Sequence, residues 1–192
     1  MLINEVASLE ESSGSSLEGS FTRDLVFSKL WLMHELARIQ PHVSTMYVLG
    51  SWYGNLALFL NRYPMVKVDH IVNVETDPER LSTSQHILDQ VDAHNVEHML
   101  KDANELDYRQ LDRDGVVVNT SLTEMPDSDW FEHIPLGTLV VLQARDHNPG
   151  EQFRNSRDIM QKFPLDQVLY SGGLELEDPE TEYTRFMTIG RK

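Results

Sequence analysis

Cysteine is absent from all 192 residues of the sequence. This absence excludes a disulfide framework, a thiolate nucleophile and a cysteine-ligated metal, and it fits a reducing compartment. Long apolar runs are also missing, since no segment reaches the ~20 residues that cross a bilayer. Residues 1–20 lack the basic segment followed by an apolar segment that marks a secretory signal. We therefore expect a cytoplasmic protein that does not bind membranes.

Basic residues are scarce. The sequence has 16 Lys and Arg against 31 Asp and Glu, which gives a formal net charge of −15, and the basic residues form no stripe. Neutralising nucleic-acid phosphates requires clustered cations, so this composition disfavours nucleic acid as a partner and a polyanion as a substrate. A small-molecule substrate is the expected partner, and the composition says nothing about the oligomeric state.

The chain divides into a tail and one domain. Residues 8–20 are small and acidic, with too little apolar surface to offset the entropy of ordering, so residues 1–20 are predicted to be a flexible tail or a flap that orders on a ligand. Residues 21–192 are long enough for a single domain with a full core. Apolar residues spaced by three and four predict an amphipathic helix over 21–40, which Pro41 ends.

Strands and helices alternate through most of the domain. Continuous apolar runs indicate parallel strands that are buried on both faces, and the last two runs have no helix between them, so they form an antiparallel hairpin. The predicted strands are 46–49, 66–74, 96–100, 115–119, 138–143, 167–176 and 183–189, and the later helices are 53–62, 78–91 and 153–163. This order predicts an α/β fold, a Rossmann-like three-layer sandwich with a mostly parallel seven-stranded sheet and an antiparallel C-terminal hairpin.

A glycine-bracketed turn follows the first predicted strand. Gly50 and Gly54 let the backbone approach a ligand closely, and the next helix begins with its amides facing that ligand. The second strand leads to Glu75, about 20 residues further on, where a ribose-binding carboxylate is expected. Asp77 competes for this role but precedes Pro78, which favours a helix N-cap.

Two aromatic residues of this turn have two interpretations. Trp52 and Tyr53 either pack beneath the turn or line a substrate pocket, and the sequence does not choose between them.

Polar residues follow the fourth and fifth predicted strands. Asn119 ends a run of valines and must find polar partners at the carboxyl edge of the sheet, where ligands bind. Gln143 and His147 follow the fifth strand and are expected on the same rim. His147 is the first candidate for a general base because of its titration range, and Glu124 is the second. No histidine spacing indicates a metal site, so none is predicted.

The order of elements and the local motifs resemble class I S-adenosylmethionine (SAM)-dependent methyltransferases. Residues 49–54 resemble the glycine-rich first motif, although two glycines remain and Tyr47 stands where an acidic residue is common. Residues 72–78 resemble the second motif, and Asp102 with Ala103 resembles the third. Strings at 118–125, 139–143 and 185–190 are similar to small phage and marine-bacterial members of unassigned substrate, in which Cys-Glu-His stands where this chain has Leu122-Thr123-Glu124.

This resemblance implies SAM as the cofactor and methyl transfer to a small-molecule or protein acceptor. Gly50 and Gly54 would give room to its methionine part, Glu75 would bind the ribose, and Asp102 and Ala103 would meet the adenine. Ser51, Trp52 and Asn119 are further expected cofactor contacts, and Asn119 is also a candidate catalytic residue. His147 or Glu124 would accept a proton. Two alternatives stay open, namely transfer or cyclisation of the aminobutyrate group of SAM and a non-catalytic nucleotide-binding domain, including one for nicotinamide nucleotides.

Overall fold

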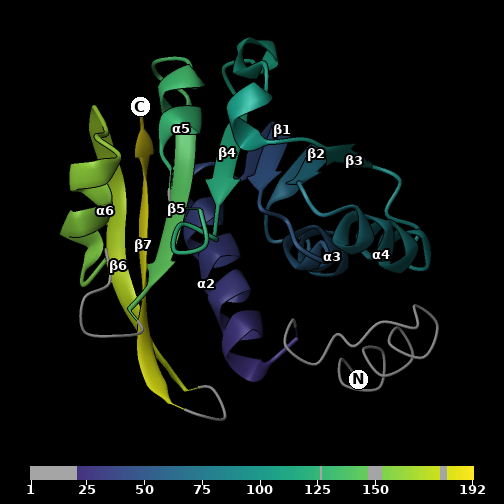
Figure 1. The fold of residues 1–192 in the computed structure, drawn as a ribbon, viewed down its shortest axis with the longest axis horizontal. Helices are drawn as coiled ribbons and strands as arrows, with labels where there is room; N and C mark the ends of the chain where they lie inside the picture. The colour runs from purple at the N-terminus through teal and green to yellow at the C-terminus, as the bar shows by residue number, and fades with distance from the viewer. Residues whose placement is uncertain (1–20, 126, 147–152, 178–180) are drawn as a thin grey trace.

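A single seven-stranded sheet forms the centre of the computed structural model, which describes residues 21–125, 127–146, 153–177 and 181–192. The strand order is β3-β2-β1-β4-β5-β7-β6 (Figure 1). The strands are β1 (His42–Leu49), β2 (Lys67–Glu75), β3 (Val96–Leu100), β4 (Val116–Asn119), β5 (Leu139–Arg145), β6 (Gln167–Glu177) and β7 (Glu182–Arg191). The first five are parallel, and β7 pairs antiparallel with both β5 and β6, which confirms the predicted fold class.

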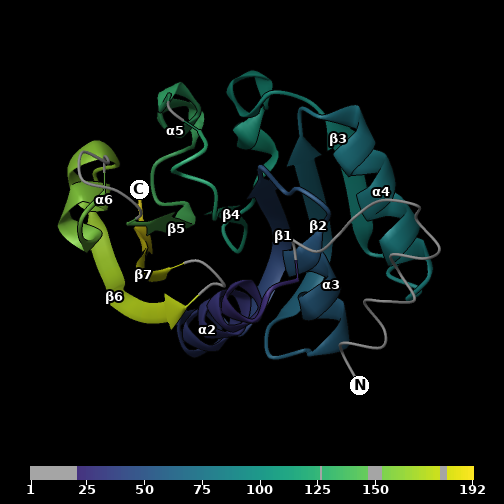
Figure 2. The same cartoon turned by 60° about the horizontal axis from the view of Figure 1, so that its bottom comes forward.

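Helices cover both faces of the sheet. They are α2 (Arg23–Ile39), α3 (Asn55–Arg62), α4 (Pro78–Asp89), α5 (Asp129–His133) and α6 (Ser156–Lys162), with short 3-10 helices η1 (Ala103–Glu105) and η2 (Tyr108–Gln110). Figure 2 shows α2 and α3 on one side of the sheet and α5 and α6 on the other. The structure is therefore the expected three-layer sandwich.

Alternate residues of the central strands enter two separate cores. In β4, Val116 and Val118 pack with the side chains of α2, α3 and α4, while Val117 packs with those of α5 and α6. Successive side chains of a strand point to opposite faces, so a sheet covered on both sides needs continuous apolar strands. This is why the run 115–119 predicts a buried parallel strand.

Several boundaries differ from the predictions. Strand β1 begins at His42, because its polar first half pairs with Lys67 and the residues that follow it in β2 although it carries no apolar run. Helix α6 begins at Ser156 rather than at 153. Helix α5 was not predicted, since its five residues are too few to show a helical period.

A buried hydrogen bond joins α2 to β7. The hydroxyl of Tyr183 donates to Oδ2 of Asp24, and both residues are buried. We expect Tyr183→Phe to lower the free energy of unfolding by about 1–3 kcal/mol, because the carboxylate loses its donor in a place that water does not reach. Urea denaturation measures this change.

Tyr170→Phe is the matched control. Its hydroxyl accepts from Nε1 of Trp31 at 3.1 Å, and both residues are partly exposed, so water replaces the lost group and the expected loss is under about 1 kcal/mol. Equal losses in the two variants would contradict a special contribution of the Asp24–Tyr183 pair.

Candidate functional site

The turn after β1 has an unusual backbone. Gly50, Trp52 and Gly54 all have positive φ, at 59°, 52° and 75°. Glycine adopts this left-handed conformation freely, whereas tryptophan does so at a cost. The carbonyl of Gly50 accepts a hydrogen bond from Oγ of Ser121 at 3.2 Å, which joins the turn to the segment after β4. The turn therefore lies at the carboxyl ends of β1 and β4.

Glu75 is fixed at the carboxyl end of β2. Its carboxylate is buried, and its Oε2 accepts from the backbone N–H of Trp52 at 2.9 Å. Oε1 accepts from the N–H groups of Thr76 at 2.9 Å and Asp77 at 3.2 Å. A carboxylate oxygen has about two acceptor sites, so the N–H groups of Thr76 and Asp77 occupy Oε1, whereas Oε2 keeps one site for a ligand hydroxyl.

A cavity of about 230 Å³ lies in front of this carboxylate. It is lined by Gly50, Trp52, Val74, Glu75, Thr76, Arg80, Lys101, Asp102, Ala103, Ser121, Glu124, Met125 and Asp127. Six residues that the sequence singles out meet here, namely Gly50, Trp52, Glu75, Asp102, Ala103 and Glu124. The cavity joins the ends of β1, β2 and β4 to the segment after β3, at the edge where ligands of α/β sheets bind.

The two aromatic residues of the turn separate. Trp52 lines the cavity, with the guanidinium of Arg80 5.1 Å from its ring centroid. Tyr53 instead packs against the core on the side of α2, α3 and α4. Tyr53 therefore packs as one interpretation expects, while contact between Trp52 and a substrate stays a prediction.

The two acidic residues next to the predicted contacts act as caps. Oδ1 of Asp77 accepts from the N–H groups of Glu79 and Arg80, at 2.9 and 3.3 Å, so the prediction of an N-cap is confirmed. Asp102 caps η1 by accepting from the N–H of Asn104 at 2.8 Å, yet it also lines the cavity. Contact between Asp102 and a ligand stays a prediction.

Gly54 lies behind the cavity rather than in its wall. A Cβ at Gly54 would stand 2.2 Å from Oγ of Ser84 and 3.0 Å from Nδ2 of Asn73. Ser84 in turn contacts Nε2 of His98 at 3.1 Å, and burial lowers the pKa of His98. Gly54 thus lets α3 start close to α4, while its contact with a ligand, like that of the buried Ser51, stays a prediction.

Asn119 contacts two residues of the cavity wall, Ser121 and Met125. It is fully buried at the end of β4, where Oδ1 accepts from the N–H of Ser121 at 2.9 Å and Nδ2 lies 3.2 Å from the sulfur of Met125. Ser121 and Met125 both line the cavity, and the sequence reasoning missed them as individual contacts. Ser121 could have been predicted as a cavity residue, because it follows the carboxyl end of the buried strand β4 by two residues. A direct role for Asn119 in chemistry stays a prediction.

Gln143 does not face the rim, so that expectation is wrong. Strand β5 continues to Arg145, which leaves Gln143 inside the sheet and fully buried, where its Oε1 accepts from the hydroxyl of Ser28 at 3.2 Å. His147 and the tail 1–20 lie outside the described residues, so their predicted roles stay predictions.

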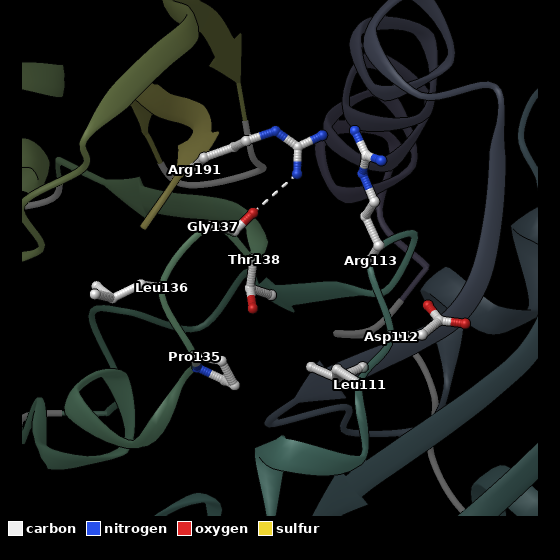
Figure 3. Close-up of a pocket in the computed structure, with 8 residues that line it drawn as sticks. All are labelled: Leu111, Asp112, Arg113, Pro135, Leu136, Gly137, Thr138 and Arg191. Carbon is white, nitrogen blue, oxygen red and sulfur yellow. Dashed lines mark hydrogen bonds between the residues drawn. The ribbon is translucent and has the colours of Figure 1, made fainter.

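A second cavity lies at the opposite edge of the sheet. It has a volume of about 480 Å³ and is lined by Leu111, Asp112, Arg113, Pro135, Leu136, Gly137, Thr138 and Arg191. Figure 3 shows the guanidinium groups of Arg113 and Arg191 on the same side of it. This cavity is larger, but it lies at the amino ends of β4 and β5, away from the carboxyl edge where α/β sheets bind ligands. The smaller cavity is therefore the candidate site.

The described part of the chain lacks both a metal-binding cluster and a membrane-spanning helix. It contains no cluster of three or more His, Asp or Glu side chains that would hold a metal ion. None of its helices has the length and apolar character needed to span a bilayer.

Comparisons with known proteins find similarity in structure but not in sequence. No family model matches the chain, and no curated protein matches it. The structure is similar to EvdMO1, with a TM-score of 0.61 and 17% identity over 85% of this chain, which spans 40% of the EvdMO1 chain. It is also similar to an rRNA methylase from Streptococcus thermophilus, with a TM-score of 0.57 and 14% identity over 89% of this chain and 98% of that one.

A third similar structure contains a ligand. M. jannaschii TYW2, crystallised in complex with AdoMet, matches with a TM-score of 0.61 and 9% identity over 90% of this chain and 78% of that chain. Identities this low relate the proteins by fold, and fold does not fix function. The chain therefore has the Rossmann-like fold of class I methyltransferases.

Proposed function

We propose that this protein is a SAM-dependent methyltransferase acting on a small-molecule or protein acceptor. The observation that carries the proposal is the Glu75 carboxylate, which three backbone N–H groups hold at the end of β2 so that it faces the cavity. A ribose hydroxyl can donate to the acceptor site that remains on Oε2, beside the N–H of Trp52. The adjacent positive-φ turn at Gly50 leaves room for the rest of such a ligand.

The cavity residues fit an adenosyl ligand. Glu75 would accept from the ribose hydroxyls, and Asp102 and Ala103 would meet the adenine edge. Trp52 and Met125 supply apolar surface, and a Cβ at Gly50 would stand 3.2 Å from Cβ of Ser121, so a side chain there would narrow the cavity. Carboxylate acceptors beside apolar side chains suit a nucleoside that carries an extended substituent.

The residues of this chain would position the reactants and move a proton. Bound SAM supplies a methyl group on a sulfonium, which an N, O or C nucleophile of the acceptor attacks in line. Asn119 fixes the turn that carries Ser121, so the wall beside the acceptor keeps one shape. The exposed carboxylate of Glu124 lines the cavity and would accept a proton from the nucleophile, a role for which His147 is the other candidate.

Binding and product analysis test the proposal. We expect calorimetry on the full chain to show binding of SAM and not of NAD. The cavity beside Glu75 has a volume of about 230 Å³, which suits one nucleoside rather than two. In incubations with SAM and fractions of small molecules or proteins, mass spectrometry should detect S-adenosylhomocysteine. Release of methylthioadenosine instead would support transfer of the aminobutyrate group, and NAD binding without SAM binding would overturn the cofactor assignment.

A further inference from the structure

Two buried cations meet beside the candidate site. Lys29 of α2 keeps 8% of its surface exposed and Arg185 of β7 keeps 5%. Both contact Thr120, the residue after β4. Nζ of Lys29 donates to Oγ1 of Thr120 at 2.7 Å, and Nη1 of Arg185 donates to its carbonyl at 3.4 Å. Three elements that are distant in sequence thus bring two positive charges to the carboxyl edge of the sheet.

Neither cation has a carboxylate partner in the described part of the chain. Within the residues that the structure describes, no acidic oxygen lies within 4.0 Å of Lys29 or Arg185, and the buried Nε of Arg185 has no hydrogen-bond partner. Asp24, the buried acid of α2, instead accepts from Tyr183. Unpaired buried charges are costly, so a site of this kind is completed by an anion or loses a proton.

The lowered pKa values of both cations favour the binding of an anion between them. Burial and, to a lesser extent, the charge of Arg185 lower the pKa of Lys29 to about 7, while Glu124 opposes both. Burial likewise lowers the pKa of Arg185, against the effects of Tyr183 and Glu124, and Arg145 on β5 adds a like charge. The carboxylate of Glu124 acts on both cations, and Glu124 is exposed.

Both cations contact Thr120, which is the sequence neighbour of a residue that lines the candidate cavity. Thr120 precedes Ser121, which lines the cavity and donates to the carbonyl of Gly50. Glu124 also lines the cavity. Hydrogen bonds join α2 to both neighbouring strands, from Lys29 to Thr120 after β4 and from Ser28 to Gln143 of β5. A substrate beside the proposed methyl donor would therefore extend toward the two cations.

We propose that the acceptor substrate carries one carboxylate or phosphate group, and that Lys29 and Arg185 bind this group at the end of β4. The inference rests on the proposed function and deepens it, because it names the substrate class. The acidic surface, with a net charge of −15, repels polyanions, whereas two buried cations suffice for a single anionic group. Arg185 would supply planar donors and Lys29 a point charge.

Nuclear magnetic resonance of the lysine side chains tests the proposal in the full chain. The titration of Lys29, assigned by comparison with Lys29→Met, is followed in acetate, in inorganic phosphate and in chloride of equal ionic strength. Bound anion stabilises the protonated amine, so we expect one or both probes to raise the pKa of Lys29 by on the order of one unit over chloride. A shift in acetate alone identifies a carboxylate site, and a shift in phosphate alone identifies a phosphate site.

Two controls separate a built site from general screening. The exposed Lys67, paired with Asp69 at 3.0 Å, should respond equally to all three salts. Arg185→Gln should abolish the probe effect on Lys29, while Arg113→Gln, at the opposite edge, should preserve it. If neither probe moves Lys29 beyond chloride in the parent protein, the anion site is overturned without any variant. SAM calorimetry on the same sample shows independently whether the proposed function holds.

Discussion

Replacing Glu75 by alanine is expected to weaken SAM binding about 10- to 150-fold in calorimetry. The ribose hydroxyls would lose hydrogen bonds to a charged acceptor, which contribute roughly 1.5–3 kcal/mol. The loss is large because the carboxylate is already oriented by the N–H groups of Trp52, Thr76 and Asp77, so the ligand does not have to order it. A variant that binds SAM as tightly as the parent would refute the ribose assignment.

Asp77→Ala is the control for this result. The Asp77 carboxylate is two residues away but caps α4, so its loss should cost about 1 kcal/mol of stability and leave SAM affinity near that of the parent. Because Glu75→Ala also removes the acceptor of three N–H groups, thermal unfolding without ligand must be measured for both variants. Weakened binding by Asp77→Ala, at a similar loss of stability, would show that the structure of the turn rather than the carboxylate determines affinity.

Among the variants considered, Gly54→Ala should lower the free energy of unfolding most, by roughly 2–5 kcal/mol in urea denaturation. Alanine at a φ of 75° is strained, and its Cβ would also stand 2.2 Å from Oγ of Ser84 and 3.1 Å from Cδ1 of Leu88. The hydroxyl of Ser84 cannot move freely, since it contacts both Asn73 and His98. The start of α3 would have to shift away from α4.

Gly137→Ala isolates the backbone contribution to this loss. Gly137 has a φ of 83°, but a Cβ there meets nothing within 4 Å. Its expected cost is therefore only that of the left-handed conformation, about 1–2 kcal/mol. If both alanine variants lose the same free energy of unfolding, close packing of α3 on α4 does not explain why Gly54 is glycine.

The sequence predicted the centre of the sheet well because strands β4 and β5 are buried on both faces. Val116, Val117 and Val118 can only be accommodated between two layers of helices, and the absence of a helix between β6 and β7 dictated their antiparallel pairing. The first half of β1 escaped prediction because its order depends on pairing with β2 rather than on apolar side chains. Helix α5 escaped because Trp130 and Phe131 enter the core from one short turn.

The candidate site divides in the same way. Glu75 and Gly50 follow strand ends, so their place at the carboxyl edge was predictable from local sequence. The packing of Gly54 against Ser84 depends on how two helices meet, and no local pattern encodes that distance. Gln143 was misplaced because the polar run after 142 hid the continuation of β5. The pair of Lys29 and Arg185 depends on β7 lying inside the sheet, beside β5.

The left-handed backbone at Trp52 links the cavity wall to the carboxylate behind it. The backbone N–H of Trp52 donates to Glu75, and the residue also lines the cavity. One residue therefore contacts both the carboxylate and the space where a ligand would bind. Coupling between two such contacts is reciprocal. We therefore expect a ligand that bonds to Glu75 to change the environment of the indole. We expect the fluorescence of Trp52 to change when the cavity is occupied, and comparison with Trp52→Phe would separate it from the other two tryptophans.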